Sequence, residues 1–328
     1  MKDLKLDQIR VALGEPNMQM RGVLKAALLA RGVGDVIDIH NFKGLHETIL
    51  RPEVDLLITD IHLGHDDPGT VCELIRAVRH HEIKANPFLP IIAITGDADR
   101  AVVARIIDSG ADHLMAKPLS MTQLEERIAA LVKSRKPFVI TSDYIGPDRR
   151  SKERAATTDV PRMEVPNILR EKAAGNAVDA DKVQRAIDTV SRRINGHKME
   201  RHAMRLVDLA RDVLAAYETY SMDAGTREDL HRMAGISEDL ERRTQNTSFA
   251  PVSELCDSLV AVSQWVSREG AKAGKRQVRL LPELAQAIQV AFKMDPHDEK
   301  TVDAITDTVR RAQDKVAAAG MTRQRLEA

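Results

Sequence analysis

Cysteine and aromatic residues are scarce in this sequence of 328 residues. Its two cysteines, Cys72 and Cys256, lie far apart and lack the spacing of metal ligands, so the sequence predicts neither a disulfide framework nor a zinc site. We expect both to be small buried hydrophobic residues. Aromatic residues make up 3% of the chain, which argues against a stacking platform for single-stranded nucleic acid, because such a platform needs several exposed rings.

An excess of either charge is also absent. Lys+Arg and Asp+Glu both number 49, so we expect no global attraction to DNA or to an anionic membrane. No apolar run approaches the roughly 20 residues that a membrane helix needs, and the first five residues lack the apolar core of a signal peptide. We therefore predict a soluble, cytoplasmic protein without a membrane partner. Its length predicts two domains.

Segments of two kinds alternate over residues 1–132: short apolar runs typical of buried strands, and longer stretches with helical periodicity. The apolar runs predict strands at 9–13, 36–40, 54–60, 90–95 and 113–116. The periodic stretches predict helices at 18–31, 42–50, 70–80, 99–109 and 121–133. Regular alternation implies a parallel sheet with helices on both faces, so the predicted fold is a doubly wound, five-stranded (βα)5 α/β domain.

Reactive side chains stand at the ends of four predicted strands. Glu15 follows the first strand, Asp60 ends the third, Thr95 ends the fourth and Lys117 follows the fifth. The carboxyl ends of parallel strands meet at one edge of a sheet, where ligands gather. A carboxylate nucleophile beside a hydroxyl and an ammonium group is suited to carrying a phosphoryl group on Asp60. Taken alone, Asp60 also fits a residue that starts a turn.

Motifs at and near these positions resemble the CheY-like receiver domain of bacterial response regulators over residues 7–132. They are Ile-Arg-Val-Ala-Leu-Gly-Glu15-Pro, Leu-Leu-Ile-Thr-Asp60, Ile-Ile-Ala-Ile-Thr95, Gly110-Ala111-Asp112 and Ala116-Lys117-Pro118. The resemblance implies a two-component signalling protein rather than an enzyme. It implies that a histidine kinase or phosphotransfer protein phosphorylates Asp60 with the help of Mg²⁺, and that Thr95 then moves toward the phosphoryl group.

Three positions depart from the family pattern. Leu13 and Gly14 stand where the family has the acidic pair that helps to hold Mg²⁺, and Leu114 stands where it has a switching aromatic residue. Mg²⁺ usually keeps several waters and takes one or two carboxylates, so Glu15 and Asp60 remain the candidate metal ligands, Glu15 acting through a water. If Mg²⁺ does not bind, the domain is expected to act as a pseudo-receiver adaptor that partners control.

Residues 133–166 are predicted to form a basic connector. Gly146-Pro147, Pro161 and Pro166 interrupt regular structure, which favours a linker or an extended arm, and basic residues gather at 149–154. Tyr144-Ile145 is an apolar anchor and Asp148 can pair with the arginines. We therefore expect the segment to dock on one of the two domains and to relay signals between them.

Only helical periodicity appears in residues 167–328. Narrow apolar stripes run through 183–194, 199–217 and 302–316, with a break at Asn195-Gly196, and further helices are predicted at 226–243, 251–269 and 282–294. The pattern predicts a separate bundle of five or six helices. The stripes suit either bundle packing or a coiled-coil homodimer, and an interaction with a protein partner is the expected output.

A short stretch around His231 looks like a histidine phosphotransfer motif. In that motif a Gly four residues after the histidine, here Gly235, leaves room for a docking receiver, but Ala234 stands where the motif has a lysine. A phosphorelay between Asp60 and His231 is therefore the alternative function. DNA is not an expected partner, because no helix-turn-helix segment with a basic reading face stands out.

Overall fold

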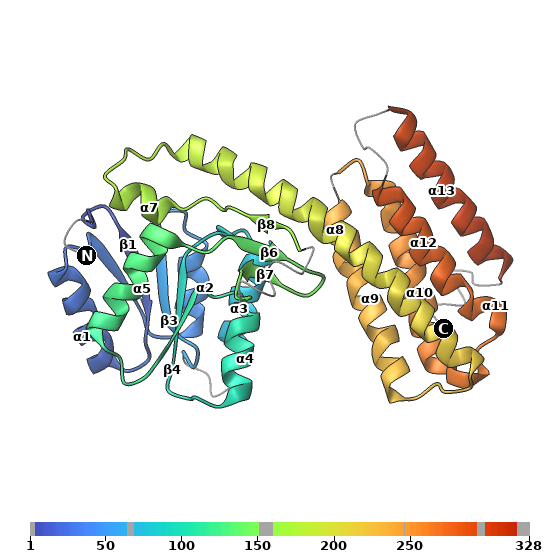
Figure 1. The fold of residues 1–328 in the computed structure, drawn as a ribbon, viewed down its shortest axis with the longest axis horizontal. Coiled ribbons are helices and arrows are strands. Elements are labelled where there is room, and N and C mark those ends of the chain that lie inside the picture. The colour runs from blue at the N-terminus through green and yellow to red at the C-terminus, as the bar shows by residue number, and fades with distance from the viewer. Residues whose placement is uncertain (1–3, 64–68, 151–159, 246, 294–298, 320–328) are drawn as a thin grey trace. The chain divides into compact units, whose positions relative to one another are not determined.

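Two compact units, Met1–Ile194 and Asn195–Ala328, make up the computed structural model of the chain (Figure 1). The structure describes residues 4–63, 69–150, 160–245, 247–293 and 299–319. Each unit has a hydrophobic core of its own. Within the described ranges, no helix has both the length and the apolar character that crossing a membrane requires.

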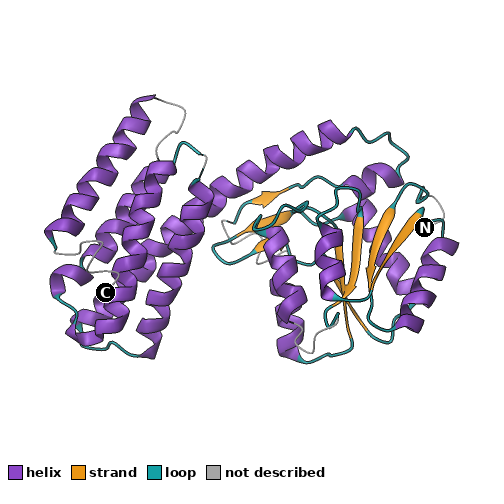
Figure 2. Ribbon diagram, turned by 180° about the vertical axis from the view of Figure 1, so that it is seen from behind, coloured by secondary structure: helices purple, strands orange, loops and turns teal. Residues whose placement is uncertain are grey.

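The first unit is built on a parallel sheet with the strand order β2-β1-β3-β4-β5. Its strands are β1 (Arg10–Gly14), β2 (Asp35–Ile39), β3 (Leu56–Asp60), β4 (Ile91–Thr95) and β5 (His113–Ala116). Its first helices are α1 (Met18–Ala30), α2 (Phe42–Ile49), α3 (Gly69–Arg79), α4 (Arg100–Asp108) and α5 (Met121–Ser134). The predicted doubly wound fold is confirmed, and Figure 2 shows helices on both sides of these strands.

Different helices cover the two faces of this sheet. α1 and α5 bury side chains such as Leu24 and Ile128 against one face, whereas α2, α3 and α4 bury Leu45, Ile75 and Ile106 against the other. Every residue of β3 and β4 is buried, as expected for central strands of a sheet that is covered on both faces. A fully packed sheet therefore holds the side chains at its carboxyl edge.

The predicted connector is more regular than its sequence suggested. It contains the short strands β6 (Phe138–Ile140), β7 (Ile145–Pro147) and β8 (Arg162–Met163), which form an antiparallel sheet in the order β7-β6-β8. The expectation of a linker without regular structure is therefore wrong for these residues, because strands of two or three residues are too short to show a readable alternation. Residues 151–159, which include part of the basic cluster, lie outside the described chain.

From residue 167 onward, the described residues form helices and no strand. The helices are α7 (Ile168–Ala173), α8 (Ala180–Glu218), α9 (Ala224–Thr244), α10 (Ser253–Glu269), α11 (Lys275–Val278), α12 (Leu280–Phe292) and α13 (Glu299–Ala318). Two 3₁₀ turns, η1 (Ala250–Val252) and η2 (Gly270–Lys272), flank α10. The prediction of a mainly helical C-terminal region is confirmed.

The connector docks on the first unit, as its apolar residues predicted. Phe138 and Ile145 pack with Phe88, which precedes β4, and with Ile187 and Ile194 from the first half of α8. The connector and the start of α8 therefore share one core with the sheet domain.

The apolar stripe breaks at Asn195-Gly196, but the helix does not, because α8 continues through both residues. A glycine inside a helix costs about 0.5–1 kcal/mol relative to alanine, which is small beside the burial of the apolar residues on either side. Ile194 is buried with the connector, whereas Met199 is buried in the core of the second unit. Packing on both sides thus keeps the helix intact.

All three apolar stripes that suggested a coiled coil contribute residues to the cores of the units. Ile187 and Ile194 of the first stripe face the connector, Leu206 of the second lies in the core of the second unit, and Ile305 and Val309 of the third lie there too. The stripes thus serve packing within each unit. The possible homodimer stays a prediction.

Candidate functional site

Three charged side chains from different strand ends meet at the carboxyl edge of the sheet. Glu15 follows β1, Asp60 ends β3 and Lys117 follows β5. The register pairs Gly14 with Thr59, so Glu15 and Asp60 come next to each other on neighbouring strands. Lys117 Nζ lies 2.7 Å from Glu15 Oε2 and 2.6 Å from Asp60 Oδ2. One ammonium group therefore bridges the two carboxylates.

Both carboxylates are buried and also accept backbone hydrogen bonds. Glu15 is 0% and Asp60 is 3% exposed. Asp60 Oδ1 accepts a hydrogen bond of 2.7 Å from the His62 N–H, and Glu15 Oε1 accepts one of 3.0 Å from the Asn17 N–H. Because a buried charge is costly unless it is paired and hydrogen-bonded, these contacts hold each carboxylate in one orientation.

Lys117 keeps its positive charge in this setting. Burial lowers the pKa of its ammonium group, but the hydrogen bonds and negative charges of Asp60 and Glu15 outweigh that effect and raise the pKa overall. One positive charge thus stands between two negative ones. The site retains a net negative charge whenever both carboxylates are ionised.

Thr95 lies at the same edge but does not contact this group of charges through a hydrogen bond. Its hydroxyl accepts a hydrogen bond of 3.0 Å from the Asp97 N–H and donates one of 3.0 Å to the Asp97 carbonyl. The side chain, 1% exposed, thus stabilises the turn that leaves β4. Its expected contact with a phosphoryl group stays a prediction.

The two positions that lack the expected acids have a structural reason for it. Leu13 is fully buried in the core, and a Cβ atom at Gly14 would lie 2.5 Å from Thr59 Oγ1 and 3.2 Å from Leu63. A carboxylate at position 13 would be buried in that apolar core, and position 14 has no space for a side chain. Sequence reasoning missed Thr59, whose signal was its place directly before Asp60 in an otherwise aliphatic run.

The two carboxylates of the site, Glu15 and Asp60, are ligands of the kind that Mg²⁺ takes in proteins. Glu15 Oε2 and Asp60 Oδ2 approach the same ammonium group, so both oxygens face one point, and Mg²⁺ commonly takes one or two carboxylates together with waters. In the part of the chain that the structure describes, no cluster of three or more His, Cys, Asp or Glu side chains could hold a metal ion. Glu15 and Asp60 are the pair of carboxylates at this edge that would hold Mg²⁺.

Leu114, at the position of the family's switching aromatic residue, packs against the buried core beneath α2, α3 and α4. Its neighbour His113 is partly buried. Burial, opposed by the charge of Asp112, lowers the pKa of His113 and so favours its neutral ring. An apolar and a neutral side chain therefore occupy this part of β5.

Comparisons with known proteins agree with this arrangement. A family model described as the response regulator receiver domain matches residues 11–129. The transcriptional regulatory protein GltR of Pseudomonas aeruginosa is 26% identical over 123 residues, which cover 38% of this chain and 48% of that protein. The response regulator protein PmrA of the same organism is 28% identical over 126 residues, covering 38% and 53%. The chain thus spans about half the length of the curated relatives it matches.

A solved structure with a similar chain trace is the receiver domain of a sensor histidine kinase from Pseudomonas aeruginosa. It is 23% identical, covers 36% of this chain and 92% of that chain, and has a TM-score of 0.32. That protein holds a magnesium ion in its active-site cleft. From the sheet topology, the strand-end residues and the matching family model, residues 11–129 are a response regulator receiver domain, followed by a mainly helical C-terminal region.

Proposed function

We propose that this chain is a two-component response regulator in which Asp60 accepts a phosphoryl group from a histidine kinase or a phosphotransfer protein. The observation that carries the proposal is the convergence of Glu15, Asp60 and Lys117 at the carboxyl edge of a receiver sheet. A buried carboxylate that is oriented by a backbone N–H and an ammonium group is suited to nucleophilic attack on phosphorus.

Each side chain has a distinct role in the proposed transfer. An Asp60 carboxylate oxygen forms the new bond to phosphorus, while the bond from phosphorus to the donor's histidine nitrogen breaks and that nitrogen keeps the electron pair. Lys117 pairs with a phosphoryl oxygen, and the Thr95 hydroxyl leaves Asp97 to donate to another. Mg²⁺ held by Glu15 and Asp60 would supply further positive charge against the phosphoryl oxygens.

The helical region is the proposed output, and it acts through a protein partner. The transcriptional regulatory protein GltR matches 38% of this chain, about the length of the receiver domain, so its output does not transfer to the helices. Phosphorylation would act by shifting the balance between two arrangements of the receiver and the segments after it.

A second candidate function, a phosphorelay, gains support from the surface of α9. His231 and Gly235 are both exposed and lie one helical turn apart, and no atom stands within 4 Å of a Cβ built on Gly235. An exposed histidine beside an open glycine leaves room for a docking receiver. In this alternative, Asp60 and His231 exchange a phosphoryl group.

Labelling with a small-molecule phosphodonor and Mg²⁺, followed by intact mass spectrometry, tests these proposals. We expect one phosphoryl adduct on the wild-type chain, its loss in Asp60→Ala, and its retention in Asp97→Ala, a matched change at an exposed aspartate of the same edge. An acid-labile adduct that persists in Asp60→Ala and disappears in His231→Ala supports the relay. A wild-type chain without any adduct rules out both and leaves the pseudo-receiver adaptor.

A further inference from the structure

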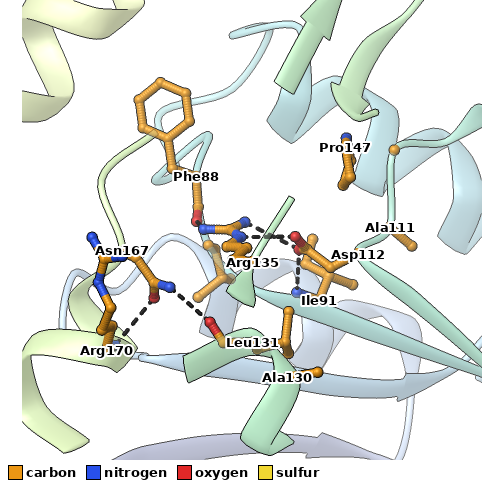
Figure 3. Close-up of polar contacts among 12 residues, drawn as sticks. Phe88, Ile91, Ala111, Asp112, Ala130, Leu131, Arg135, Pro147, Asn167 and Arg170 are labelled. Atoms are coloured by element: carbon orange, nitrogen blue, oxygen red, sulfur yellow. Dashed lines mark hydrogen bonds and ion pairs between the residues drawn. The ribbon is translucent and has the colours of Figure 1, made fainter. Parts of the chain in front are cut away.

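The start of β5 is held by a buried cluster of charges. Asp112, 6% exposed, accepts hydrogen bonds from Arg79 at 2.9 Å and from Arg135 at 2.8 and 3.1 Å. Both guanidinium groups lie 5.2 Å from the centre of the Phe138 ring, within the range of cation–π attraction. We call Arg79, Asp112, Arg135 and Phe138 the Asp112 clamp. Figure 3 shows Arg135 between Asp112 and Phe88.

The clamp joins α3 and β5 of the receiver to the connector. Arg79 is the last residue of α3, Arg135 directly follows α5, and Phe138 is the first residue of β6. Arg135 also donates to the Phe88 carbonyl at 2.7 Å, and Arg79 donates to three backbone carbonyls nearby. A charge-assisted network of this kind, buried and satisfied, fixes the elements that supply it.

The connector touches the turn before β5 at two more points. Arg149, after β7, donates to the Ala111 carbonyl. β7 approaches the same turn so closely that a Cβ on Gly110 would lie 2.7 Å from the Ile145 carbonyl oxygen, and one on Gly146 would lie 2.9 Å from Gly110 Cα. The turn that leads into β5 is thus packed directly under the connector sheet.

β5 itself is short and lies at the edge of the sheet. It has four residues and pairs with β4 alone. Its register is set at the start by a reciprocal pair of bonds, in which Asp112 N–H donates to the Ile91 carbonyl at 2.8 Å and Ile91 N–H donates to Asp112 Oδ2 at 2.9 Å. At its other end, the Lys117 N–H donates to the Thr95 carbonyl at 2.8 Å.

We propose that Asp112 is a positioning residue for Lys117: the connector grips the start of β5 and thereby fixes the ammonium group at its end between Glu15 and Asp60. An edge strand makes backbone hydrogen bonds to a neighbouring strand on one side only, so contacts at its two ends contribute much to keeping it in position. Five residue steps, roughly 16 Å of strand, separate the two residues. This inference rests on the proposed function only in assuming that Lys117 takes part in phosphoryl transfer.

The reactivity of Lys117 toward an amine-acylating reagent measures its position without any phosphoryl transfer. Cleavage after arginine yields the peptide 106–127, in which Lys117 is the sole lysine, so its labelling rate is read by mass spectrometry. Lys25, paired with Asp38 on the receiver and the sole lysine of the peptide 22–31, gives the reference rate. An ammonium group released from its carboxylates is more exposed and loses its proton more easily, so it reacts faster.

We expect Asp112→Asn to raise the Lys117 rate about fivefold, a change that corresponds to about 1 kcal/mol, with the Lys25 rate unchanged. Asp148→Asn is the matched control. Asp148 is also buried, but its side chain pairs with Arg150 and Arg162 of the connector and not with a residue of the clamp, so the Lys117 rate should stay at its wild-type value.

A folded Asp112→Asn chain with an unchanged Lys117 rate overturns the proposal. If both lysines react faster, unfolding accounts for the result, and Phe138→Leu then decides, because it loosens the clamp without leaving a buried arginine unpaired. In that variant, a selective rise at Lys117 supports the proposal and no selective rise contradicts it. The labelling rate of Lys117 does not depend on whether Asp60 accepts a phosphoryl group. A chain that forms no phosphoryl adduct would therefore contradict the proposed function without contradicting the positioning role of Asp112.

Discussion

Position 14 lacks a side chain because the structure leaves no space for one. The Thr59 hydroxyl fills the place where a side chain would stand, and it donates a hydrogen bond of 3.0 Å to the Asp60 carbonyl. The acid nearest the end of β1 is therefore Glu15, which reaches the same ammonium group as Asp60. Gly14, Thr59 and Glu15 together define how the site of this receiver differs from the family pattern, which has an acidic pair at positions 13 and 14.

We predict that Gly14→Ala lowers the free energy of unfolding by about 1–3 kcal/mol, because the new methyl group overlaps Thr59. Removing the hydroxyl in Gly14→Ala/Thr59→Ala should recover part of that loss, and urea denaturation of the four chains of the double-mutant cycle measures the coupling. The control is Gly22→Ala in α1, where a Cβ meets no atom within 4 Å and stability should rise by about 0.5–1 kcal/mol. Additive effects of the two changes would contradict this account.

The sequence was sufficient to place Glu15, Asp60, Thr95 and Lys117 at one edge, since the ends of parallel strands must converge. It did not reveal that Glu15 pairs directly with Lys117 or that Thr95 bonds to Asp97. Those contacts depend on strand register and on side-chain rotamers, which periodicity does not encode.

At the scale of the element, α8 uses two faces in turn. The last buried residue of the first stripe is Ile194, and the first of the second is Met199, a step of five positions instead of the usual three or four. Because a helix turns once every 3.6 residues or so, a step of five positions interrupts the regular stripe in the sequence. A loss of phase beside Asn195-Gly196 resembles a helix end in the sequence, although here it marks a change of packing partner.

A buried polar group fastens α8 to α9. His202 Nε2 lies 2.8 Å from Asp239 Oδ2, which also accepts a hydrogen bond of 2.8 Å from Arg243, and Arg242 pairs with the same carboxylate. His202 is 3% exposed. Burial, opposed by the hydrogen bond to Asp239 and helped by the charge of Lys198, lowers the pKa of His202.

This shift predicts a loss of stability in mild acid. The unfolded chain takes up the proton near the ordinary histidine pKa of about 6.5, whereas folded His202 takes it up at a lower pH. The stability that neutral His202 contributes is therefore complete above that range and falls as the pH drops through about 6.5 toward the folded pKa. Urea denaturation over a pH series should show this fall in the wild-type chain.

In His202→Gln the slope of stability against pH should be smaller, because that titration is removed. His40→Gln, a change at an exposed histidine, should keep the wild-type slope. Equal slopes in the wild-type chain and in His202→Gln would show that His202 is not the titrating group.

At the scale of the whole molecule, the receiver's compact unit extends beyond the five helices and five strands that define the family match. Leu169 and Ala173 of α7 belong to the receiver core, Asn167 donates to the Leu131 carbonyl at 2.8 Å, and Lys172 pairs with buried Asp55 at 2.8 Å. These contacts join residues far apart in sequence, so the helical periodicity that grouped residues 167–328 together did not reveal them.

We predict that a chain ending at Ser134 is less stable than one ending at Ile194. The shorter chain lacks Arg135 and Phe138, so the buried pair of Arg79 and Asp112 loses two of its partners and becomes exposed to solvent. Loss of a partner from a buried ion pair commonly costs about 3–5 kcal/mol. Thermal unfolding of the two chains compares them directly, and equal midpoints would show that the connector contributes no stability to the receiver.

The Asp112 clamp also predicts a sequence signature that can be sought in related proteins. Its members come from α3, the start of β5, the end of α5 and β6, and they act on the site at Asp60 only through the position of Lys117. Selection on the connector should therefore preserve or lose Arg79, Asp112, Arg135 and Phe138 together. Covariation of these four positions across receivers would identify the proteins that carry the same docked connector, even where the helices that follow have diverged beyond recognition.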